Sequence, residues 1–401
     1  MKNQFCLRGN HKLQNPQKHV VFLLLFVLLA VFVAGCDKEI PLNAPINDAQ
    51  ENIAAVSKLN APELASAPVV SSITDLGAIG QPASVLTRDG GSSTVVGGKM
   101  LWLFGDSFFK NGVKSVDGDS FRSNSAAIAD LTMPLDVTER LDINDTPYKA
   151  IPFTAAEKAY NASTGRLDDR IALWPGGMMT EKSGKGLVFY LKIHVLPNPN
   201  DPGKVIYQPL GVGTARFASG KTTASRDTGL LFNANEPQFN RPLVYNGMVY
   251  LYGSLPTVPG SFPSYGVARA PFKNATKRSA YTFWNGSAWV SDVNQATAIM
   301  YFIPGAVTVS YNAYLQTFIA IHSQFDSDKI VFKTASSPEG PWSLAAELFT
   351  GMPAAGTDSN NRAGQEHPEL AKDNGQTIYV SYYNPQSLLQ GDLRLVEVTF
   401  N

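Results

Sequence analysis

The feature of the sequence that most restricts the fold is a unit that recurs five times between residue 73 and the C-terminus. Each unit has a polar or aromatic cluster, a short apolar run, a turn containing Gly or Asn, and a strongly aromatic run. Repetition of one supersecondary unit in this way is typical of solenoids and propellers. The aromatic runs of the five units centre on Trp102, Phe189, Tyr250, Phe318 and Tyr379.

The runs themselves predict strands, because they are short, rich in aromatic and β-branched residues, and bounded by Gly, Pro, Asn and Asp. A third run follows in each unit and a fourth in several, whereas the last unit stops at Asn401 without one. Residues 73–79 precede the first unit and can supply the missing strand. We therefore predict an all-β chain folded as a five-bladed β-propeller, its ring closed by an N-terminal strand that completes the last blade. The alternative is a β-sandwich with coincidental similarity between its hairpins.

The N-terminus has the pattern of a bacterial lipoprotein signal. Basic residues precede the uncharged apolar run 20–34, which is shorter than the roughly 20 residues that a membrane-spanning helix needs. The run ends in Val-Ala-Gly-Cys, so Cys36 is the predicted site of lipid attachment; an uncleaved anchor helix is the alternative. The predicted organisation is a signal peptide (1–35), a lipidated cysteine with a flexible spacer (36–72) and a propeller domain (73–401).

Composition excludes several classes of function. Thirty-three basic residues balance 33 acidic ones, so no nucleic-acid partner is indicated. The two cysteines are Cys6, which leaves with the signal, and Cys36, so the mature domain has none left for a disulfide. No zinc, redox or phosphate-loop motif occurs, and we predict neither a metal nor a cofactor. The expected location is the cell envelope, with the lipid-anchored chain facing the periplasm or the exterior.

Propeller geometry selects candidate site residues. The first strand of each blade runs along the central channel and the second returns antiparallel, so the start of one and the end of the other share a face. The residues so selected are Arg88, Asp89, Trp174, Asn235, Glu236, Glu366, His367 and Glu369 at strand starts, and Asp106 and Tyr383 at strand ends. Carboxylates that converge beside an aromatic side chain suit glycoside hydrolysis, in which one acid protonates the leaving oxygen and another carboxylate attacks or activates water.

Each candidate also has a structural interpretation. Asp89 precedes two glycines and could belong to a turn, and Asp106 could cap the end of an apolar strand. Glu236 could be a solvated loop residue, His367 a buried structural histidine, and Trp174 a packing residue. We predict Asp89, Asp106 and Glu236 as catalytic acids, Glu236 being a third acid or a modulator of the others. The remaining candidates are predicted to bind substrate.

Several segments also resemble a known family. The runs RDGGSS, LWLFGDSFF and YGVARAPF, together with the C-terminal HPEL and TIYVSYYNP, are similar to a bacterial family labelled a domain of unknown function, which includes endo-D-arabinanases of glycoside hydrolase family 183. The resemblance covers about residue 73 to the C-terminus. It implies a five-bladed propeller that hydrolyses furanosidic linkages. It also implies that a pair of first-blade aspartates, matching Asp89 and Asp106, is catalytic.

The function predicted from the sequence is that of a membrane-anchored glycoside hydrolase. Its partner would be a polysaccharide or other extracytoplasmic glycan with arabinofuranose-type linkages, and the membrane would hold it through lipid on Cys36. A long insertion between Leu131 and Arg170 could reshape the cleft. The alternative function is that of a non-catalytic glycan-binding or envelope scaffold lipoprotein, which would need no pair of acids.

Overall fold

The computed structural model describes residues 67–256, 263–355, 360–387 and 390–401. The predicted signal peptide, Cys36 and most of the predicted spacer lie outside the described residues. Within the described ranges, no helix is long and apolar enough to span a membrane. The strands form five antiparallel sheets.

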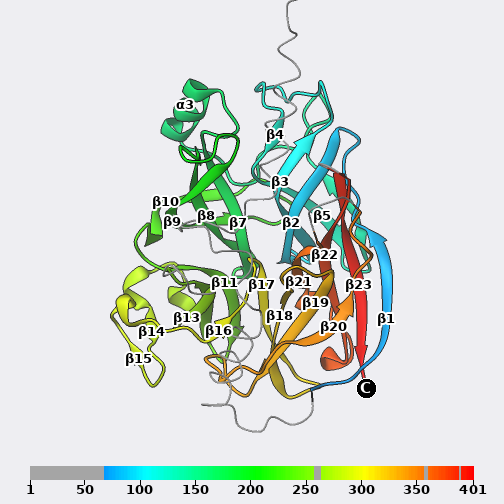
Figure 1. Cartoon of the computed structure of the whole chain (residues 1–401), viewed down its shortest axis with the longest axis vertical. Helices are drawn as coiled ribbons and strands as arrows, with labels where there is room; N and C mark the ends of the chain where they lie inside the picture. The colour runs from blue at the N-terminus through cyan, green and yellow to red at the C-terminus, as the bar shows by residue number, and fades with distance from the viewer. Residues whose placement is uncertain (1–66, 257–262, 356–359, 388–389) are drawn as a thin grey trace, which may run out of the picture.

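The innermost strands of the five sheets follow one another along the chain (Figure 1). The strands of each sheet run outward largely in sequence order, except that β1 forms the outer edge of the fifth sheet and β16 returns to pair with β13 in the third. The first contains β2 (Val85–Val96), β3 (Lys99–Phe109), β5 (Ser125–Asp130) and β6 (Met133–Glu139), with β4 (Phe121–Arg122) beside β3. The second contains β7 (Arg170–Thr180), β8 (Gly186–Pro197), β9 (Val205–Phe217) and β10 (Ser225–Asn233). The third contains β11 (Gln238–Tyr245), β12 (Met248–Ser254), β13 (Ser264–Pro271), β14 (Thr282–Trp284), β15 (Trp289–Val290) and β16 (Met300–Tyr301).

The fourth sheet contains β17 (Val307–Asn312), β18 (Thr317–Ser323), β19 (Lys329–Ala335) and β20 (Ala346–Thr350). The fifth contains β21 (Arg362–Glu366), β22 (Thr377–Ser387), β23 (Gln390–Phe400) and β1 (Val70–Ala78). The helices are α3 (Ala155–Thr164) and the short 3-10 turns η1 (Phe272–Asn274), η2 (Arg278–Ala280), η3 (Val293–Gln295), η4 (Pro368–Leu370) and η5 (Asp373–Gly375).

The sheets close into a ring. The first strands of neighbouring sheets contact one another all the way round, from β2 through β7, β11, β17 and β21 back to β2. β1 pairs antiparallel with β23 from Val70 opposite Phe400 to Ala78 opposite Arg394, and Figure 1 shows the two strands side by side. The predictions of a five-bladed β-propeller and of a closing N-terminal strand are therefore confirmed. That strand begins at Val70, slightly earlier than predicted.

Tight turns set the register of the hairpins at the channel. Gly97 and Gly98 join β2 to β3 with φ of 59° and 78°, and Asn246 and Gly247 join β11 to β12 with φ of 47° and 75°. Two successive residues with positive φ make the two-residue turn whose twist matches that of paired strands. The register of β2 and β3 decides where Asp89 lies relative to Asp106.

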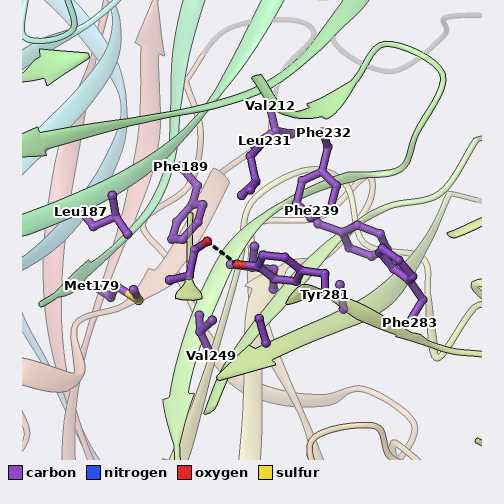
Figure 2. Close-up of a cluster of buried hydrophobic side chains, with 14 residues drawn as sticks. Met179, Leu187, Phe189, Val212, Leu231, Phe232, Phe239, Val249, Tyr281 and Phe283 are labelled. Atoms are coloured by element: carbon purple, nitrogen blue, oxygen red, sulfur yellow. Dashed lines mark hydrogen bonds between the residues drawn. The ribbon is translucent and has the colours of Figure 1, made fainter. Parts of the chain in front are cut away.

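Apolar side chains fill the space between neighbouring blades. Five large buried clusters lie one at each junction, and they join blades 1–2, 2–3, 3–4, 4–5 and 5–1. Figure 2 shows the junction of blades 2 and 3, where Phe189 of β8 and Phe239 of β11 belong to one buried cluster. In the same cluster, Tyr281 donates a hydrogen bond of 2.6 Å to the Ala275 carbonyl. Burial of these faces stabilises the ring, because apolar area removed from water contributes about 25 cal/mol per Å².

The insertion predicted between Leu131 and Arg170 is partly regular structure. It contains β6, the outer strand of blade 1, and α3, which contacts β7. Thr154 and Glu157 form a reciprocal capping box at the start of α3. The buried Glu157 carboxylate also pairs with Arg226 and Lys192 of blade 2. The insertion is thus fixed to blade 2 beside the start of its innermost strand.

Candidate active site

Asp89 and Asp106 lie on the paired strands β2 and β3, at an irregularity of their register. Arg88 pairs with Ser107 and Gly90 with Phe104, so Asp89 alone faces the two residues Gly105 and Asp106. Such a bulge changes the direction in which local side chains project and is common beside active sites. The local fold therefore brings Asp89 of β2 opposite Asp106 of β3.

The carboxyl group of Asp106 is held by blade 2. Trp174 Nε1 donates a hydrogen bond of 3.0 Å to Asp106 Oδ1, and Arg170 Nη2 lies 3.3 Å from Oδ2. Burial raises the pKa of Asp106 to about 6; Arg170 and the Trp174 hydrogen bond oppose this rise, and the charge of Asp89 adds to it. The side chain keeps 19% of its surface exposed. Asp106 is thus an acid that can be protonated near neutral pH and still reach a ligand.

The carboxyl group of Asp89 is held by blade 5. Arg362 Nε lies 3.3 Å from Asp89 Oδ2, and the backbone amide of Gly90 donates a hydrogen bond of 2.7 Å to Oδ1. The Arg362 guanidinium lies 4.1 Å from the centre of the Tyr383 ring, and the Tyr383 hydroxyl is 2.8 Å from Thr87 Oγ1. Tyr383 therefore positions the arginine that compensates the charge of Asp89.

Aromatic side chains border the pair on the side of blade 2. The rings of Trp174 and Tyr207 have centroids 5.2 Å apart, with their planes inclined by 58°. Burial raises the pKa of Tyr207 to about 12, and the charges of Asp106 and Asp89 contribute to the rise. Blades 1, 2 and 5 thus supply one site, in which two carboxyl groups lie beside a pair of aromatic rings.

Arg88 was predicted to bind substrate, and the structure places it away from this site. Adjacent strand residues project to opposite faces, so the Arg88 side chain leaves β2 on the side away from Asp89. It is 2% exposed, lies 2.7 Å from Glu139 of β6, and donates a hydrogen bond of 2.6 Å to the Gly80 carbonyl. Its position indicates a structural role inside blade 1.

Glu236 is engaged by a different set of residues. Its Oε1 accepts a hydrogen bond of 2.9 Å from Arg278 Nε, and its Oε2 accepts one of 2.7 Å from the Asn233 amide. The carboxylate thus stabilises the turn between β10 and β11, where Asn235 is exposed. No contact recorded within the described ranges brings Glu236 to Asp89 or Asp106, and its predicted catalytic role receives no support from the geometry.

Glu366, His367 and Glu369 were predicted at the start of a channel strand, and that placement is wrong. β21 begins at Arg362 and ends at Glu366, so Glu366 is the last residue of the strand and His367 and Glu369 follow it. His367 is 1% exposed, its Nε2 lies 2.8 Å from Ser381 Oγ, and burial lowers its pKa to about 3. It is a buried histidine between blades 5 and 1, in keeping with the structural alternative.

Sequence reasoning missed three residues of the site. Arg170 is the first residue of β7, and residues at the starts of innermost strands are expected to face the site. From this strand, however, only the aromatic Trp174 was predicted. Arg362 opens β21, whose short sequence RAGQE has no apolar alternation. Tyr207 lies on β9, the third strand of its blade, whereas candidates were selected only from the first and second strands.

The C-terminal part of the chain matches a known family model. Residues 213–401 match the family described as "Domain of unknown function (DUF4185)". The match agrees with the resemblance seen in the sequence and extends from blade 2 to the C-terminus. No curated protein is similar enough to this chain to count as a relative.

Solved structures with a similar fold include a protein from Bacteroides ovatus ATCC 8483 described as a candidate hydrolase. It has a TM-score of 0.51 and 16% identity, over 80% of this chain and 87% of that one. The GH62 α-L-arabinofuranosidase of Coprinopsis cinerea has a TM-score of 0.47 and 10% identity, over 83% of this chain and 98% of that one. The GH43_1 enzyme of Xanthomonas citri complexed with xylotriose has a TM-score of 0.46 and 12% identity, over 80% of this chain and 89% of that one. At these identities the likeness concerns the fold.

Proposed function

We propose that the protein is a glycoside hydrolase whose catalytic carboxyl groups are Asp89 and Asp106. The observation that carries the proposal is the pairing of two carboxyl groups with different surroundings at one end of the channel. Asp106 is mostly buried with a raised pKa, and Asp89 faces Arg362. Two acids in unlike environments are what glycoside hydrolysis needs, since one must donate a proton while the other stays ionised.

The geometry favours distinct roles for the two groups. Asp106, protonated, donates its proton to the glycosidic oxygen as the bond from that oxygen to the anomeric carbon breaks. Asp89, ionised, attacks the anomeric carbon or takes a proton from the water that does so. Arg170 and Trp174 orient Asp106, and Arg362 orients Asp89. The overall reaction consumes one water and leaves one new reducing end.

The proposed substrate is a glycan with arabinofuranose-type linkages. This choice rests on the sequence resemblance, whose first-blade aspartates coincide with the pair in the site. The rings of Trp174 and Tyr207 lie beside the pair, and aromatic rings are apolar surfaces on which sugar C–H groups can pack. The exposed part of Asp106 lies beside that surface, so a sugar resting there would present its linkage to the acid.

Incubation of the purified full chain with D-arabinan, L-arabinan and arabinogalactan tests the proposal. Release of reducing ends is expected from an arabinofuranose-containing glycan, and Asp106→Asn is expected to lower the rate by at least about 100-fold, the usual contribution of general acid catalysis. Thermal unfolding of the variant is expected to stay near that of the wild type. Binding of these glycans without release of reducing ends would instead favour a lectin-like protein.

We further propose that lipid on Cys36 holds the enzyme in the cell envelope. Support comes from the signal-like N-terminus and the small residues before Cys36. Incorporation of a labelled fatty acid into the protein in its bacterial host tests this proposal, and Cys36→Ser is expected to abolish incorporation. Cys6→Ser is the matched control and should keep the label. Equal labelling of both variants would contradict the assignment of Cys36.

A further inference from the structure

The central channel contains a second polar space, a cavity of about 440 Å³. It is lined by Ser92–Thr94 near the end of β2, by Gly177–Thr180 at the end of β7, and by residues of β11, β17 and β21. Asp89 precedes the lining residues of β2, and Asp106 lies on β3, which contributes no residue to the lining. The cavity is therefore separate from the proposed active site, and its volume is within the usual range of small-molecule sites, about 300–1,000 Å³.

The strongest feature of the cavity is the guanidinium group of Arg241. Its Nη1 donates a hydrogen bond of 3.2 Å to Gln365 Oε1, whereas its Nε is buried and has no hydrogen-bond partner in the structure. Within the described ranges, no carboxylate lies within ion-pair distance of it. Partial removal of a charge from water without a counter-charge is costly, and a guanidinium group binds a carboxylate through its N–H donors.

A second residue of the lining has a polar atom without a hydrogen-bond partner. Ser92 is 8% exposed, lines the cavity, and its hydroxyl oxygen has no hydrogen-bond partner. Its neighbour Ser93 donates to Glu369 Oε1. Ser310 donates a hydrogen bond of 2.6 Å to Glu366 Oε2. The lining thus combines side chains that are already paired with two side chains that each have a polar atom without a hydrogen-bond partner.

Both glutamates of the cavity lie where their charged form is disfavoured. Burial raises the pKa of Glu366 to about 7, with the nearby charge of Glu369 adding to the rise. Burial also raises the pKa of Glu369. When Glu366 is protonated, it repels an anionic ligand little and offers an O–H donor as well as an acceptor.

We infer that this cavity binds a small sugar acid, whose carboxylate contacts Arg241 and whose hydroxyl groups contact Ser92, Glu366 and Glu369. A neutral sugar would leave the guanidinium without a counter-charge. A divalent cation would meet a positive side chain, and within the described ranges no group of three or more acidic, histidine or cysteine side chains is arranged to hold a metal. The inference goes beyond the proposed hydrolase activity and does not depend on it.

Calorimetric titration of the full chain with D-galacturonate and with D-galactose tests the inference. Galacturonate should bind, and galactose should bind at least about tenfold more weakly, since hydrogen bonds to charged groups stabilise more than neutral ones. Arg241→Gln should weaken galacturonate binding at least about tenfold. Ser92→Ala should weaken it too, and this small change keeps the test valid if the arginine variant does not fold.

Asp106→Asn is the control for the active site and should leave galacturonate binding unchanged. A large loss in that variant would place the ligand at the active site and overturn the inference. Equal affinity for galactose and galacturonate, undiminished binding by Arg241→Gln, or calcium binding that competes with galacturonate would also overturn it. So would the absence of any galacturonate binding by the wild type.

Discussion

Asp106 is the residue on which the proposed mechanism most depends, and opposing effects set its pKa. Burial favours the protonated form, whereas Arg170 and the hydrogen bond from Trp174 favour the ionised form. The result is a pKa of about 6, well above the ordinary aspartate range. An acid catalyst must be protonated, so activity is expected to fall as the pH rises through this value.

Trp174→Phe tests this balance. The change removes the hydrogen bond that stabilises ionised Asp106, so the pKa of Asp106 should rise and the descending limb of the pH profile of kcat/KM should move to higher pH. The maximal rate should also fall, because the acid loses its orientation. Trp289→Phe is the control, since Trp289 lies in blade 3 beside Arg269. A descending limb that stays in place in Trp174→Phe would contradict this role.

At the scale of the strand, alternation explains why neighbouring residues have unrelated roles. Asp89 projects into the site, whereas Arg88 projects into blade 1 and pairs with Glu139, with side chains only 1% and 2% exposed. The sequence RDGG predicts a functional cluster but does not show which side chain faces the channel. The irregular pairing of Asp89 with Gly105 and Asp106 decides this, and it is followed by Gly90 and Gly91, which both have positive φ.

Arg88→Met tests the structural role of this ion pair. Removal of one partner leaves a buried charge uncompensated, so the free energy of unfolding should fall by about 3–5 kcal/mol. The double variant with Glu139→Leu should recover much of that loss. Lys99→Ala is the control, because it removes only an exposed pair with Asp130 and should leave the free energy of unfolding nearly unchanged. Chemical denaturation measures the free energy of unfolding of all three variants. Loss of activity in Arg88→Met at wild-type stability would instead support substrate binding.

β21 shows where strand prediction from the sequence failed. The segment after residue 361 contains Ala363 with φ of 57°, and the register with β22 shifts between Arg362 and Gln365. Prediction relied on the polar run that contains Glu366 and therefore placed this channel strand too late. The correct start brings Arg362 to Asp89 and moves Glu366 to the second cavity. Such irregular backbone at a functional site is not encoded in a simple alternation pattern.

At the scale of the whole molecule, the repeats predicted the fold well. Five aromatic hairpins, a missing last strand and a spare N-terminal strand together specified both the number of blades and the closure of the ring. The division of the channel into two sites was not predictable in the same way. It depends on how far Arg241 and Glu366 lie along their strands relative to Asp89, and only the assembled ring shows this.

Deletion of β1 tests ring closure. A chain that begins at residue 79 exposes the edge of β23 and loses the strand that joins the two ends of the domain. We expect a lower Tm, less cooperative unfolding and a greater tendency to aggregate through the free edge. Asp75→Ala is the control, since it removes only the partly exposed pair with Arg394 and should cost about 1 kcal/mol or less. An unchanged Tm after the deletion would show that closure contributes little.

The central claim is that Asp89 and Asp106, and not the other acids selected from the sequence, carry the reaction. The most direct test is release of reducing ends from arabinofuranose-containing glycans by Asp89→Asn, Asp106→Asn and Glu236→Gln, measured beside the wild type at equal concentrations of folded protein. The account predicts a loss of at least about 100-fold in each aspartate variant and substantial activity in Glu236→Gln. Wild-type turnover by either aspartate variant, or loss of activity in Glu236→Gln alone, would contradict it.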